Sequence, residues 1–162
     1  MEPNEDDQAR LEALSARFIQ ALRSKADGDL DTAEDELRAV LRAEPRLPEP
    51  HMELARVLLD TGRLEEAEVH GREALGYLEA GGQWTDEIPE PVVLALCNAL
   101  LAEILRQRAD QDDVIFGDPV AFRAMLDEAR ERFETAARLD PRDEYSSFHA
   151  FFLGPVGGTP EA

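Results

Sequence analysis

Cysteine is almost absent from this 162-residue sequence. The single one, Cys97, can form no disulfide within the chain, and its place in the apolar run 92–102 is typical of a small buried hydrophobe. No apolar run approaches the roughly 20 residues that cross a bilayer, and the acidic first ten residues lack the apolar stretch of a secretory signal. We therefore expect a cytoplasmic protein with no membrane partner.

Positive charge is also scarce. Lysine and arginine number 17 against 36 aspartate and glutamate residues, which gives a formal net charge of -19. A field of this sign repels nucleic-acid phosphates and anionic lipid surfaces, so nucleic acid is not expected as a partner. It attracts a basic or amphipathic protein or peptide; the alternative is that the charge only keeps the protein in solution.

The residue types that form metal sites or phosphate-binding loops show none of the spacings that such sites require. His51, His70 and His149 are scattered, and none has a metal-ligand spacing to Cys97 or to another histidine. The glycines at 154, 157 and 158 are followed by no helix, so they do not form a phosphate-binding loop. We expect no enzyme activity, no metal and no cofactor.

Helical periodicity is what the sequence does contain. Apolar residues recur at spacings of three and four, as in Leu11, Leu14, Phe18 and Leu22, which places them on one side of a helix. Prolines and glycines interrupt the pattern because neither continues a helix well. The sequence predicts helices over about residues 11–25, 30–41, 48–59, 64–78, 92–108, 119–139 and 143–153.

Two pairs of these helices repeat. Gly28 and Gly62 are 34 residues apart, and at the same offset Ala21 matches Ala55. Small residues let two helices approach closely, and glycine permits a left-handed turn between them. A helix-turn-helix period of 34 residues resembles the tetratricopeptide repeat, whose hairpins stack into superhelical arrays.

A third unit matches less regularly. The run 101–105 repeats the pattern of the run 54–58, and Ala129, Phe133 and Ala136 match the family's second helix. Between the two helices of this unit the chain is about 15 residues longer than in the second unit, which indicates an insertion.

The resemblance implies an all-α protein, a right-handed superhelical array of three hairpins plus a C-terminal capping helix. In the first unit, a two-residue shift from the family register puts Phe18, Ile19 and Leu22 in the core. The predicted parts are a disordered acidic lead at 1–8, a tetratricopeptide-like domain at 9–141, a C-terminal aromatic helix at 142–153 and a disordered tail at 154–162. The three units span about 9–45, 48–80 and 91–141, with an inserted loop near 109–117.

Arrays similar to this one hold a peptide or a partner helix in a concave groove lined by the first helix of each unit. The resemblance therefore implies a protein-binding module, an adaptor or chaperone-like protein. The residues that would line the groove are Glu49, Met52, Arg56, Leu59 and Asp60 from the second unit, and Leu96, Ala99, Glu103 and Arg106 from the third. The alternative for each is that it covers the core or faces water.

The fifth predicted helix is apolar on nearly all sides, since only Asn98 and Glu103 are polar between residues 92 and 105. Such a helix must be covered on more than one face. The flanking helices, the C-terminal segment or a partner are the three candidates for that cover. A buried Asn98 also needs a hydrogen-bond partner, because an unpaired amide costs about 1–3 kcal/mol.

The C-terminal helix carries Tyr145, Phe148, Phe151 and Phe152, and three of them, Tyr145, Phe148 and Phe152, share one face. One interpretation is a cap that seals the last unit. The other is self-association, in which this helix and the fifth one make a homodimer and the protein is a structural scaffold. Trp84 in the linker is either a packing anchor or a contact residue. Size, acidity and three units are also similar to the cytosolic chaperones of type III secretion translocators.

Overall fold

The computed structural model describes residues 4–153, and eight helices account for most of this range. Their bounds are α1 (Glu5–Ala26), α2 (Leu30–Ala43), α3 (Pro48–Asp60), α4 (Leu64–Glu79), α5 (Glu90–Ala109), α6 (Asp112–Ile115), α7 (Pro119–Leu139) and α8 (Glu144–Phe152). No strand occurs within residues 4–153, and consecutive helices pack as pairs. The predicted all-helical array of hairpins is confirmed.

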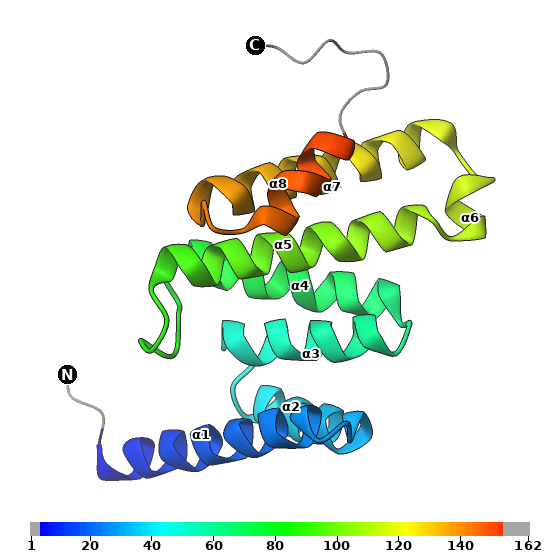
Figure 1. Cartoon of the computed structure of the whole chain (residues 1–162). Coiled ribbons are helices and arrows are strands. Elements are labelled where there is room, and N and C mark those ends of the chain that lie inside the picture. The colour runs from blue at the N-terminus through cyan, green and yellow to red at the C-terminus, as the bar shows by residue number, and fades with distance from the viewer. Residues whose placement is uncertain (1–3, 154–162) are drawn as a thin grey trace.

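The helix pairs stack in one direction. Helix α1 pairs with α2, α3 with α4, and α5 with α7, and each second helix also contacts the first helix that follows, α2 with α3, α4 with α5 and α7 with α8. Figure 1 shows this stack from α1 and α2 at one end to α7 and α8 at the other. Ala21, Ala33, Ala55 and Ala67 are fully buried, so small residues lie at the helix contacts, where the repeat predicts them.

The turns within the first two pairs have the same hydrogen bonds. Gly28 and Gly62 have φ values of 84° and 78°, in the left-handed region that glycine adopts without strain. After each glycine, the next backbone N–H returns to a carbonyl near the end of the preceding helix, from Asp29 to Ser24 and from Arg63 to Leu58, both at 2.9 Å. This closure satisfies a carbonyl that the helix leaves unpaired.

The N-terminus corrects one expectation. Residues 5–8 are not a disordered lead but form the first turn of α1. The side chain of Asn4 accepts a hydrogen bond from the backbone N–H of Asp7 at 2.7 Å, which caps the helix. The acidic residues that follow Asn4 lie at the positive end of the helix dipole, which stabilises this end further. Residues 1–3 and the predicted tail 154–162 lie outside the described part of the chain.

Helix α1 also buries a different side than expected. Phe18 is buried, as predicted, but Ile19 is 46% exposed and Leu22 is 36% exposed. Leu14, Phe18, Ala21 and Ser24 form the buried side instead. The reason is that α1 contacts α2 and, to a smaller extent, α3, and within residues 4–153 no other helix packs extensively against its remaining side.

Helix α5 is covered by its neighbours. It packs most extensively on α7, and α4 and α3 also contact it. Asn98 is only 3% exposed. Its amide donates to the carbonyl of Leu94 at 2.9 Å, and its side-chain oxygen accepts from Arg132 of α7 at 3.5 Å. The flanking helices therefore cover α5 on several sides, as the sequence predicts. Helix α7 also supplies a hydrogen-bond donor to the side-chain oxygen of Asn98.

Candidate protein-binding face

Helices α1, α3 and α5 are the first helices of the three pairs, and they carry the residues assigned to partner binding. Leu22, Arg56 and Glu103 occupy equivalent positions, since Leu22 precedes Arg56 by the 34-residue period and Glu103 follows the alanine that matches Ala55. We define the α1–α3–α5 face as Leu22 and Lys25 of α1, Glu53, Arg56, Leu59 and Asp60 of α3, and Leu96, Ala99, Glu103 and Arg106 of α5.

Two predicted contact residues, Glu49 and Met52, do not belong to this face, because each is only 6% exposed. Met52 is part of the hydrophobic core. The Glu49 carboxylate accepts backbone hydrogen bonds from Trp84 at 3.0 Å and from Thr85 at 2.9 Å. Burial raises the pKa of Glu49, although these amides act in the opposite direction. Glu49 therefore holds the linker of its own chain, which corrects its assignment to a partner.

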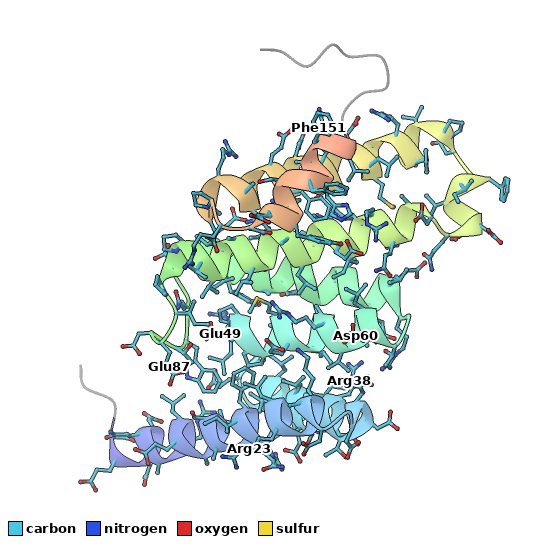
Figure 2. All side chains as sticks on the ribbon, viewed as in Figure 1. Arg23, Arg38, Glu49, Asp60, Glu87 and Phe151 are labelled. Atoms are coloured by element: carbon cyan, nitrogen blue, oxygen red, sulfur yellow. The ribbon has the colours of Figure 1, made fainter. Side chains whose placement is uncertain are left out.

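The linker between α4 and α5 is ordered by several such contacts. The Trp84 ring packs against Phe18 of α1, with ring centroids 5.6 Å apart. The Gln83 amide donates to the carbonyls of Thr85 at 2.6 Å and Ile88 at 2.8 Å, which fixes the turn of the linker. Figure 2 shows Glu49 near this linker and Glu87 at its outer side. Trp84 is thus a packing anchor, and the linker covers one end of α3.

The central part of the α1–α3–α5 face joins α1 to α3 through charge. Lys25 donates to the Glu53 carboxylate at 2.8 Å, and both side chains are largely shielded from water. Arg56 is farther from the same carboxylate, with Nε at 4.0 Å from Oε1. The Arg56 Nε is buried and has no hydrogen-bond acceptor within residues 4–153. The rest of the Arg56 side chain is partly exposed.

The α5 part of the face is tied to α8. Leu96 is 38% exposed and Ala99 is half-buried. Glu103 accepts hydrogen bonds from Arg106 at 2.6 Å and from the Tyr145 hydroxyl at 2.8 Å. Burial alone would raise the pKa of Glu103, but these hydrogen bonds outweigh it and lower that pKa. The Glu103 side chain is therefore engaged within the chain, as Glu49 is.

Helix α8 covers α7 with a different face than the one expected. Tyr145 and His149 pack against the fully buried Phe133, with ring centroids at 6.0 Å and 5.1 Å. Phe148, expected on the same side as Tyr145, is 57% exposed, and Phe151 is 71% exposed. Figure 2 shows Phe151 at the outer end of the stack. The side chain of Phe152 lies outside the described residues.

Comparison with known proteins identifies one repeat within this chain. Residues 25–70, which contain both turn glycines, match the model of the tetratricopeptide repeat. The chain contains a tetratricopeptide repeat. Tetratricopeptide repeats are generally protein–protein interaction modules and are typically not catalytic, and no enzyme family is identified for this chain.

The fold also resembles a solved structure, the globular C-terminal domain of P. aeruginosa LpoP. The two are 24% identical, with a TM-score of 0.51 over 69% of this chain and 93% of that domain. No curated protein matches the sequence. Within residues 4–153, no helix combines the length and apolar character required to cross a membrane.

Proposed function

We propose that this tetratricopeptide protein binds a segment of another protein on the α1–α3–α5 face, and so acts as an adaptor or chaperone-like module. The observation that carries the proposal is a partly apolar surface on which the Arg56 side chain is 30% exposed and, within residues 4–153, has only a 4.0 Å ion pair with Glu53. Leu22 and Leu96 are exposed on either side, on α1 and α5. A partner that brings a carboxylate to the exposed part of the Arg56 guanidinium and an apolar side chain to the leucines matches this surface.

The charges on the face suit an amphipathic segment. Lys25 and Arg106 are paired with Glu53 and Glu103, so the cations of α1 and α5 are partly neutralised. The net charge of -19 acts at longer range and attracts basic proteins. We therefore propose that the segment has an apolar side and basic residues outside the central contact.

Site-specific photo-crosslinking tests this proposal. A photoreactive residue is introduced at Leu22 or at Leu96, and at the exposed Glu65 of α4 as a matched control. We expect Leu22 and Leu96 to capture the same protein in an extract of the native cells. The unlabelled wild-type chain should compete for it, whereas the Arg56→Glu variant should compete at least tenfold less well. Capture from Glu65 alone, or equal competition by Arg56→Glu, would contradict the proposal.

Self-association through α8 is a second candidate, favoured by the exposure of Phe148 and Phe151. Light scattering on the full chain measures this directly. A dimer that dissociates in a Phe148→Asp, Phe151→Asp variant supports the candidate, and a monomeric wild-type chain at the highest attainable concentration excludes it.

A further inference from the structure

A crevice with a volume of ≈ 230 Å³ lies between α2 and α4. It is lined by Arg38, Leu41 and Arg42 of α2, Leu54 of α3 and His70 of α4. The two leucines belong to the core and give the crevice an apolar base. Two arginines and a histidine are close together here, in a chain where acidic residues outnumber basic ones by two to one.

The two arginines differ in how far their charge is compensated. Arg38 donates to Glu34 at 2.9 Å and to Glu66 at 3.0 Å, so its charge is largely offset. Arg42 is exposed and forms no ion pair or side-chain hydrogen bond within residues 4–153. Arg42 therefore supplies positive charge that nothing in the described chain neutralises.

The histidine at the crevice is fixed by a second histidine. His51 is 7% exposed, and its Nε2 donates to the carbonyl of Pro45 at 2.6 Å. A neutral His51 then has an unprotonated Nδ1. This atom lies 3.0 Å from Nδ1 of His70, so His70 must be the donor of that hydrogen bond. Nε2 of His70 remains as the atom that takes up a proton, and protonation there leaves the bond to His51 intact.

The surroundings of His70 hold it in the neutral form when the crevice contains no anion. Burial, followed by the neighbouring His51 and Arg38, lowers the pKa of His70. Glu66 and Glu73 on the same helix oppose this effect but do not reverse it. An anion beside His70 favours the charged imidazolium and so acts in the direction that raises its pKa.

We propose that the crevice between α2 and α4 binds an oxyanion, either a carboxylate or a tetrahedral group such as sulfate or phosphate. Arg42 attracts the anion, and His70 binds it in the protonated form. The site lies between second helices of the repeat, apart from the α1–α3–α5 face, so it does not depend on the function proposed above. Binding at this site takes up a proton and is stronger in mildly acidic solution.

Proton NMR titration of the three histidines tests the site on the full chain. Ring signals are assigned with single histidine substitutions and followed against pH in sulfate, acetate or chloride at equal ionic strength. We expect sulfate or acetate to move the titration midpoint of His70 upward from its value in chloride by about 0.5 pH unit, which corresponds to about threefold stronger binding by the protonated form. A response to sulfate alone indicates a tetrahedral ligand, and a response to acetate alone indicates a carboxylate.

Two variants separate binding from general charge effects. Arg42→Gln should abolish the anion-dependent shift, whereas Arg23→Gln, on the exposed side of α1, should leave it unchanged. The midpoint of His149, on α8, should not respond to the anion. Identical His70 midpoints in all three salts overturn the proposal, and so does a shift that persists in Arg42→Gln or that appears equally at His149.

Discussion

Replacing Glu49 with alanine should release the linker between α4 and α5 without unfolding the helices. The Glu49 carboxylate accepts hydrogen bonds from the backbone N–H groups of Trp84 and Thr85, and within residues 4–153 no other acceptor binds these two amides. A buried donor left unpaired costs about 1–3 kcal/mol. Trp84 and Thr85 are half-buried, so water can reach the freed amides and the lower end of this range applies.

The expected loss is therefore about 2 kcal/mol, or about 1 kcal/mol for each amide. The substitution also removes a buried carboxylate whose pKa is raised by burial, which keeps the loss near this lower value. For a chain of this size, about 2 kcal/mol corresponds to a fall in Tm of about 4–8 °C. A Glu49→Gln variant, which keeps an acceptor oxygen, should lose less.

Trp84 reports on the linker because it is the single tryptophan of the chain. In Glu49→Ala its emission should move to longer wavelength and acrylamide should quench it more strongly, at temperatures where the circular dichroism of the helices is unchanged. Glu87→Ala is the matched control, since Glu87 is exposed in the same linker. Equal quenching of Trp84 in the wild type and in Glu49→Ala would refute the reasoning.

Three further predictions concern the packing of the array. Arg72→Met removes a two-point contact with Glu128, at 2.8 Å for each nitrogen. Because both side chains are partly exposed, we expect urea titration to show a loss of at most about 1 kcal/mol, and a smaller one at high salt. Ala67→Leu puts a larger side chain where no surface is exposed, so thermal melting should show a loss of about 1–3 kcal/mol, with no comparable effect of Glu65→Leu. Burial raises the pKa of the Cys97 thiol to about 12, so a disulfide reagent should label it only in urea, and rapid labelling of the folded chain would contradict the structure.

The helices and their pairing follow from local features of the sequence. Glycine at 28 and 62 is required by a left-handed backbone, and the alanines at matching positions are required by close helix contact. Both the turn and the helix contact are formed by residues close together in the sequence, so the 34-residue repeat of these glycines and alanines predicts where they occur. The inserted segment after α5 is also indicated by length, although the short helix α6 within it is not.

The surface was harder to predict because it depends on contacts between distant residues. Nothing in the sequence near Glu49 indicates that its carboxylate binds amides 35 and 36 residues away. A tryptophan in a linker was the one sign of such an anchor. The rotation of α1, which leaves Ile19 and Leu22 exposed, depends on which neighbours pack against that helix. The cellular compartment and the binding partner stay predictions, because the packing of helices determines neither of them.

Two carboxylates that the sequence assigns to partner contact determine how binding experiments on this protein must be interpreted. The repeat assigns both Glu49 and Glu103 to partner contact, yet one binds the linker and the other binds Tyr145 of α8. A variant at either position therefore disturbs a segment of the protein itself, and a loss of partner binding there has two explanations. Leu22 and Arg56 take part in neither of these hydrogen-bonded contacts, so a substitution at either leaves both in place. A loss of binding in such variants, with Trp84 emission unchanged, is the result that identifies the face as the contact surface.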